Sequence, residues 1–130
     1  MTFKIYNLIK ETLYWCTLVK LPSLAQKHHM VGYRPRVQPG NERFVHHMML
    51  YECHAPSPDH AFSRHVDAMA GYECYTPNMP EDFLKCRGIV AAWGLGGEPF
   101  LFPEDAGYPL GEEHGGATYY MFEVRHLFIN

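Results

Sequence analysis

Two adjacent histidines, His46 and His47, are the residues of this chain best suited to metal chemistry. They lie in an apolar, strand-like run, 44–53, that ends on a cysteine. Neutral imidazole is a good ligand for copper, and a site built only from histidines can cycle between Cu(II) and Cu(I) without a charged ligand shell. An isolated pair is more often just two side chains on a half-exposed strand, so the copper interpretation depends on the rest of the sequence.

The strand itself raises a geometric problem for this interpretation. Adjacent residues of a regular strand point to opposite faces, so His46 and His47 could not both reach one metal ion from a flat strand. A strand end, a bulge, or the use of Nδ1 of one ring and Nε2 of the other would each bring the two nitrogens to one point. The sequence does not choose among these three.

Six short runs rich in β-branched and aromatic residues predict strands. They span residues 14–21, 28–33, 44–53, 86–93, 98–102 and 118–124. Turn residues separate them, most clearly at 38–41, where proline presets the first turn dihedral and glycine and asparagine accept positive φ. Because no segment shows a sustained helical period of apolar residues, the sequence predicts an all-β fold, an antiparallel β-sandwich that is jelly-roll-like and without repeats.

Length and charge limit the classes of function. A chain of 130 residues is one domain with one core. Its formal charge of −3 offers no basic surface, so we expect no nucleic-acid partner. No apolar run approaches the roughly 18 residues that span a bilayer, so we expect no membrane span.

The four cysteines, an even number, are typical of an oxidising compartment. They contain no Cys-x-x-Cys spacing, which disfavours zinc knuckles and thioredoxin-like sites, and three disulfide connectivities remain open. The first ten residues have no signal-peptide pattern. We therefore expect the natural N-terminus to be missing or altered; a cytosolic protein with four free thiols is the alternative.

Ten short motifs follow one another in an order and spacing that match one protein family. They are Tyr14-Trp15-Cys16, Lys20-Leu21-Pro22, Lys27-His28-His29, Gln38-Pro39-Gly40-Asn41-Glu42, Val45-His46-His47-Met48, Cys86-Arg87, Ala91-Ala92-Trp93, Phe102-Pro103-Glu104, Ala106-Gly107 and Glu123-Val124. The pattern resembles the N-terminal copper domain of the copper type II, ascorbate-dependent monooxygenases, in the branch of dopamine β-monooxygenase, tyramine β-hydroxylase and monooxygenase X. The resemblance covers residues 10–124, which leaves 1–9 as a segment outside the pattern and 125–130 as a divergent tail.

The resemblance implies a set of site residues. It pairs Cys16 with Cys74 and Cys53 with Cys86, which would hold the proline-rich connection 55–85, a segment expected to have no hydrogen-bond ladder of its own. It makes His46 and His47 ligands of an electron-transfer copper. The third ligand of the family would be a histidine directly after Glu123-Val124, but here that position is Arg125 and a histidine follows only at His126. A shift by one residue turns a strand side chain to the other face, and arginine is not an ordinary metal ligand.

The resemblance also implies a function for the complete enzyme. It would hydroxylate an activated C–H bond of a small amine-like substrate, with copper as cofactor and ascorbate as reductant, in the secretory pathway or outside the cell. Oxygen activation would belong to a second copper domain that is missing here, so this chain looks truncated and is expected to be inactive alone. The alternative is a non-catalytic secreted β-sandwich interaction module or an inactive truncated product.

The other histidines are expected to have no metal role. His28 and His29 are expected to lie next to each other on a strand, with one ring buried and the other exposed to solvent. The remaining ones lie in polar segments and are expected to face solvent: His54, His60, His65 and His114.

Overall fold

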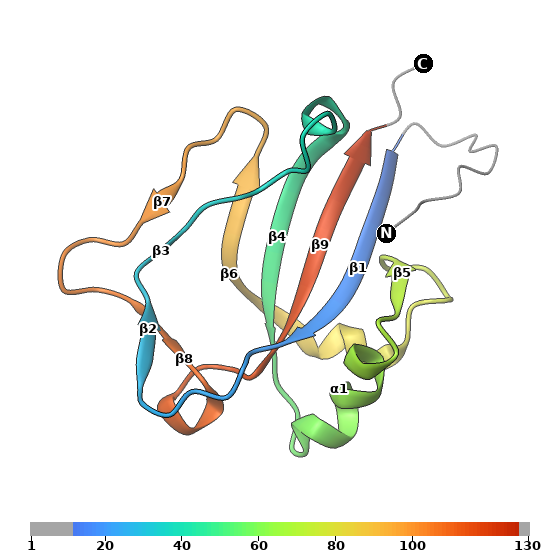
Figure 1. The fold of residues 1–130 in the computed structure, drawn as a ribbon. Helices are drawn as coiled ribbons and strands as arrows, with labels where there is room; N and C mark the ends of the chain where they lie inside the picture. The colour runs from blue at the N-terminus through green and yellow to red at the C-terminus, as the bar shows by residue number, and fades with distance from the viewer. Residues whose placement is uncertain (1–11, 128–130) are drawn as a thin grey trace.

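The computed structural model describes residues 12–127, and its largest element is a five-stranded antiparallel sheet (Figure 1). The strand order is β5-β1-β9-β4-β6. Its members are β1 (Thr12–Lys20), β4 (Val45–Cys53), β5 (Gly71–Glu73), β6 (Cys86–Gly94) and β9 (Tyr119–Leu127). Strand β9, the last in sequence, lies at the centre and pairs with both β1 and β4.

Two small sheets form a second layer beside this main sheet (Figure 1). They pair β2 (His28–Met30) with β8 (Tyr108–Leu110), and β3 (Gly32–Tyr33) with β7 (Phe100–Leu101). The Tyr33 hydroxyl donates to the Ala92 carbonyl oxygen at 3.2 Å and so joins this layer to β6. The predicted all-β, antiparallel sandwich is thereby confirmed.

The core lies on the opposite face of the main sheet, beneath helix α1 (Pro58–Asp67) and the 3₁₀ helix η2 (Glu81–Lys85). Alternate residues of β1, β4 and β9 point into it, as the period of two in a strand requires. Phe62 of α1 lies 5.4 Å, centroid to centroid, from the Tyr119 ring of β9. The largest fully buried side chains are Tyr119, Phe62, Phe83, Met121, Cys16 and Cys53.

Strand β5 pairs with β1 and corrects the sequence prediction, which placed no hydrogen-bond ladder in the connection 55–85. Helix α1, in the same connection, corrects it as well. Proline at its start suits the first helical turn, where the missing N–H would have no partner. Its buried residues, Ala61, Phe62 and His65, share one face. Two apolar residues in one short helix are too few to register as a helical period, so the pattern was missed.

His65 also departs from its prediction as a solvent-facing residue: it is 7% exposed. Its Nε2 lies 3.2 Å from Oδ2 of Asp82 on η2, and its ring packs edge-on against Phe83. Asp82 also accepts hydrogen bonds from Arg64 at 2.9 Å and Lys85 at 3.0 Å. This cluster joins α1 to η2, the two elements that cover the core.

One disulfide links the segment after β5 to the sheet, and the other joins two neighbouring strands of the sheet. Cys16 of β1 is bonded to Cys74, and Cys53 of β4 to Cys86 of β6, the same pairing that the resemblance implies. The closed segments span 58 and 33 residues, and cross-links of that length stabilise a fold by about 4 kcal/mol each in the chain-entropy account. All four thiols are consumed, so the alternative with four free thiols is not the state that the structure describes.

Two further 3₁₀ turns complete the described chain, η1 (Glu42–Phe44) before β4 and η3 (Glu112–His114) before β9. Among the helices of residues 12–127, none is long and apolar enough to cross a membrane.

The Asp82 cluster gives a prediction on acid stability. Burial alone would raise the pKa of Asp82, but hydrogen bonds from Lys85, His65 and Arg64 outweigh it and lower the pKa to about 2. A folded-state pKa below the ordinary value contributes stability that is complete above about pH 4 and is lost as the pH falls towards 2. We expect Asp82→Asn to lower the unfolding free energy at pH 7, because it removes the charge that these hydrogen bonds stabilise. The loss should be only about 1 kcal/mol, because solvent screens the attraction of Arg64 and Lys85 to Asp82.

Thermal denaturation at pH 7 and at pH 2 measures this effect. The difference between Asp82→Asn and the unmodified chain should shrink at pH 2, and the control Asp67→Asn, on an exposed residue of α1, should change little at either pH. Equal losses at the two pH values would show that the charge of Asp82 is not the cause.

Candidate metal centre

The His46-His47 pair lies at the start of β4, next to the last residues of β9 and at the upper edge of the main sheet in Figure 1. Turn η1 leads into this end of β4. Both imidazoles are half-buried, which leaves them sheltered and still reachable from solvent.

A β-bulge at the pair resolves the geometric problem. Val45 pairs with His126 of β9 and His47 pairs with Arg125, so two steps along β4 match one step along β9. His46 is therefore the extra residue of the bulge. Its carbonyl still accepts a hydrogen bond from the Leu95 amide at 2.9 Å. Of the three possibilities that the sequence left open, the backbone shows the bulge.

The bulge turns both rings toward one point. The Nδ1 atoms of His46 and His47 are 3.4 Å apart, and the ring planes meet at 74°. Metal–imidazole bonds of about 2.0 Å at tetrahedral or trigonal angles place two ligand nitrogens roughly 3.3–3.5 Å apart. Two neutral nitrogens therefore converge at a separation that suits a copper ion.

The third ligand position does not fit a metal. Arg125 pairs with His47 in the β9 register and brings its guanidinium Nη1 to 3.5 Å from His46 Nδ1. The Arg125 Cζ also lies 5.5 Å from the centre of the Tyr14 ring. A permanent cation stands at the position where the resemblance implies a third donor, and its charge opposes the approach of a metal ion.

His126 does not replace the lost ligand. It follows Arg125 in a regular strand, so its side chain points to the other face. Burial lowers the pKa of His126, which keeps the ring neutral near pH 7. Among residues 12–127, the one group of three clustered donor residues is Cys16, Cys74 and Glu123, and its two sulfurs are joined in a disulfide.

The side of His47 away from His46 faces the core. Its Nε2 lies 3.5 Å from a carboxylate oxygen of Glu123, which is 4% exposed, and its ring lies 5.7 Å from that of Tyr14. Sequence analysis did not single out Glu123 as a functional residue. A signal was present, because Glu123 occupies an inward position of a strand whose neighbours on that face, Tyr119 and Met121, are apolar.

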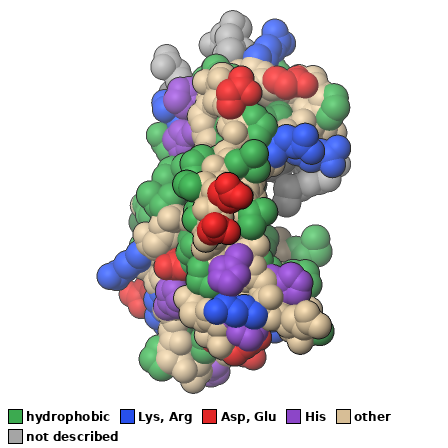
Figure 2. Space-filling model, turned by 90° about the vertical axis from the view of Figure 1, so that its left-hand side faces the viewer, with side chains coloured by type: hydrophobic (Ala, Val, Ile, Leu, Met, Phe, Trp, Pro, Cys, Tyr) green, Lys and Arg blue, Asp and Glu red, His purple; other side chains and the backbone are tan. Residues whose placement is uncertain are grey.

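The other histidine pair takes no part in this site. His28 and His29 of β2 are both exposed, which corrects the expectation that one ring would be buried. His28 Nδ1 lies 2.6 Å from the Gln26 carbonyl oxygen. The pair lies in a three-residue strand of the small second layer. Figure 2 views the molecule from the side of this layer and shows several histidine side chains in the lower half of that face.

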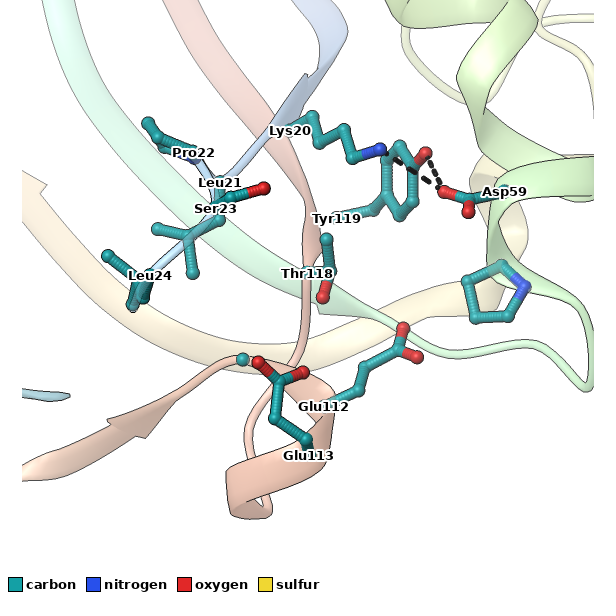
Figure 3. Close-up of a pocket in the computed structure, with 12 residues that line it drawn as sticks. Lys20, Leu21, Pro22, Ser23, Leu24, Asp59, Glu112, Glu113, Thr118 and Tyr119 are labelled. Carbon is teal, nitrogen blue, oxygen red and sulfur yellow. Dashed lines mark hydrogen bonds and ion pairs between the residues drawn. The ribbon is translucent and has the colours of Figure 1, made fainter. Parts of the chain in front are cut away.

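A polar cleft of about 350 Å³ lies at the other end of the sheet, where β1 ends and β9 begins (Figure 3). The Lys20 ammonium lies 3.3 Å from Asp59, and the Tyr119 hydroxyl donates to the same carboxylate. Glu112 and Glu113 line the facing wall. These groups tie α1 to β1 and add no histidine to the metal site.

Known proteins match this chain over most of its length. The sequence profile described as "Copper type II ascorbate-dependent monooxygenase, N-terminal domain" matches residues 3–128. "DBH-like monooxygenase protein 1" of Mus musculus is 40% identical over 102 residues, which are 78% of this chain and 16% of the mouse protein.

Two further relatives match at similar identity. "Dopamine beta-hydroxylase" of Homo sapiens is 38% identical over 117 residues, covering 90% of this chain and 18% of the human protein. "MOXD1 homolog 1" of Drosophila melanogaster is 36% identical over 124 residues, covering 89% of this chain and 17% of the fly protein. The chain thus spans about a sixth of the length of these relatives.

The geometry predicts which histidines bind copper. The oxidised chain should bind copper weakly, and His46→Ala or His47→Ala should reduce the affinity on the order of tenfold or more, because each removes one of two converging donors. His28→Ala should leave the affinity unchanged. Competition titration with a chromophoric copper chelator measures this, and equal losses in all three variants would show that the pair is not the site.

Proposed function

This chain belongs to the copper type II ascorbate-dependent monooxygenase family, of which it matches the N-terminal domain, and we propose that it serves there as an electron-transfer copper domain. The observation that carries the proposal is the convergence of the two Nδ1 atoms at the bulge of β4. An ordinary strand pair would place these rings on opposite faces.

His46 and His47 would hold the copper, which supplies one-electron redox chemistry when bound. Both ligands are uncharged imidazoles, so no anionic ligand favours Cu(II) over Cu(I); the nearest carboxylate, Glu123, lies behind the His47 ring. The Arg125 guanidinium beside His46 opposes the divalent ion more than the monovalent one, because Coulomb repulsion scales with the charge of the metal. The site is therefore expected to bind Cu(I) in preference to Cu(II), and to bind both weakly.

The chain spans only about a sixth of the length of its relatives, so the rest of the activity is proposed by analogy with those longer proteins. Two relatives are named monooxygenase or hydroxylase, and one of them is a dopamine hydroxylase. We infer hydroxylation of an amine-like small molecule, with ascorbate as the reductant and oxygen activated at a second copper domain. Two disulfides in the described chain support passage through the secretory pathway.

A second candidate function is favoured by one observation, the arginine at the third ligand position. A chain with this substitution could keep its core and disulfides and act as a non-catalytic interaction module. The two candidates differ in whether the His46-His47 pair binds copper at all.

The substitution Arg125→His tests the electron-transfer proposal. It removes a cation and adds an imidazole opposite His47, so the copper affinity should rise by at least tenfold, and the Cu(II) electron paramagnetic resonance spectrum should show an added nitrogen ligand. Arg43→His, on nearby η1, is the matched control and should leave both unchanged.

The same samples should show no turnover. With ascorbate, copper and oxygen supplied, neither the unmodified chain nor Arg125→His should hydroxylate a phenylethylamine above a control of copper and ascorbate alone, because one copper site cannot supply the chemistry of two. Turnover by the unmodified chain would contradict the assignment as an electron-transfer domain, and an unchanged affinity in Arg125→His would contradict the proposed ligand position.

A further inference from the structure

Glu123 is a carboxylate in an unusual place. It is 4% exposed, on the core face of β9 between β1 and β4, opposite Cys16 on one side and Met49 on the other. Burying a carboxylate costs several kcal/mol unless partners replace its water. The groups that contact the Glu123 carboxylate therefore indicate its role.

The two oxygens of Glu123 have different partners. Oε2 accepts a hydrogen bond of 2.9 Å from the Tyr75 hydroxyl, and Oε1 lies 3.5 Å from Nε2 of His47. His47 Nε2 is fully buried and has no hydrogen-bond partner closer than this among the described residues. The carboxylate is thus the one acceptor that a proton on this nitrogen can face.

Tyr75 reaches the carboxylate from outside the sheet. Its ring is 59% exposed, but its hydroxyl points down onto a buried group. Its backbone has a φ of 59°, in the left-handed region that non-glycine residues rarely adopt. Such a conformation persists only where the surroundings fix it, and these are the preceding Cys74, bonded to Cys16, and the Met79 sulfur, 3.4 Å from the Tyr75 amide.

The disulfide places these groups together. The sulfurs of Cys16 and Cys74 and a carboxylate oxygen of Glu123 all lie within 4.8 Å of one another. Burial, and then the Glu123 carboxylate, raise the pKa of both Tyr75 and the neighbouring Tyr51, so both hydroxyls keep their protons as hydrogen-bond donors.

We propose that Tyr75 and Glu123 are positioning residues for the copper ligand His47. Tyr75 fixes the carboxylate through Oε2, and Oε1 holds the proton of His47 on Nε2. The lone pair of His47 is then left on Nδ1, directed at the point that His46 Nδ1 also faces. The expected effect on copper affinity rests on the proposed copper site. The expected position of the His47 proton does not, because it follows from the contacts of the His47 ring alone.

A purely structural role for Tyr75 would have different consequences. Any buried tyrosine hydrogen bond stabilises the fold, and Tyr120 makes one of the same length, 2.9 Å, to the Ala117 carbonyl oxygen. Tyr120 follows Tyr119 on β9 and points to the face away from Glu123. Tyr120→Phe is therefore the matched control, since it removes a tyrosine hydrogen bond of the same length without touching His47.

The first measurement uses metal-free protein. Long-range ¹H–¹⁵N spectra of the full oxidised chain should show His47 with its proton on Nε2. In Tyr75→Phe the carboxylate is free to turn, and in Glu123→Gln the amide can present oxygen or nitrogen, so both variants should show a mixture of tautomers. Tyr120→Phe should match the unmodified chain.

The second measurement is copper(I) affinity by competition with a chromophoric chelator. Loss of a group that orients a ligating histidine typically weakens metal binding by about 10–100-fold, and we expect the lower end for Tyr75→Phe, with no change for Tyr120→Phe. Unchanged tautomer and affinity in Tyr75→Phe, or equal changes in Tyr120→Phe, would overturn the proposal. If the unmodified chain bound no copper but the tautomer shifts appeared as described, the proposed function would fail and the positioning of His47 would stand.

Discussion

The register of β9 between β1 and β4 is the constraint on which the rest of the structure depends. This one strand presents Tyr119 and Met121 to the core, Glu123 to the disulfide and to His47, and Arg125 to His46. Because side chains alternate along a strand, a slip of one residue would move all of these groups to the other face. The core, the buried carboxylate and the third ligand position are therefore set by the same backbone pairing.

The bulge in β4 is the second element of this design. A regular pairing would satisfy every backbone group and would separate the two imidazoles. The extra residue at His46 disrupts the ladder locally and brings two Nδ1 atoms together. A bulge re-aims side chains in this way, and this one lies between the interior strands β4 and β9, directly after the turn η1 that leads into β4.

The metal site and the core are not separate regions. His47 faces His46 with one nitrogen and the buried Glu123 with the other, and Glu123 touches the disulfide that fastens β1 to the segment after β5. The Cys16–Cys74 disulfide thus has two effects: it restricts the unfolded chain, and it fixes groups near the site. Arg125 is the residue that fits this arrangement least, since it brings a cation to the two histidines that we propose as copper ligands.

The sequence alone determined the strand-forming runs, the turn at 38–41, the histidine pair and the family resemblance, because each depends on local residue type and spacing. It also predicted that Arg125 breaks the ligand pattern. The sequence did not predict α1, because the few buried residues of this helix give too weak a helical period. It also predicted that His65 faces solvent, whereas His65 is buried and contacts Asp82, a residue 17 positions later in the chain.

Only the tertiary structure decided how adjacent histidines meet and which groups lie behind them. The bulge arises from pairing between β4 and β9, and the contact of Tyr75 with Glu123 joins residues 48 positions apart. Such contacts depend on register and on chain crossings, which local sequence does not encode.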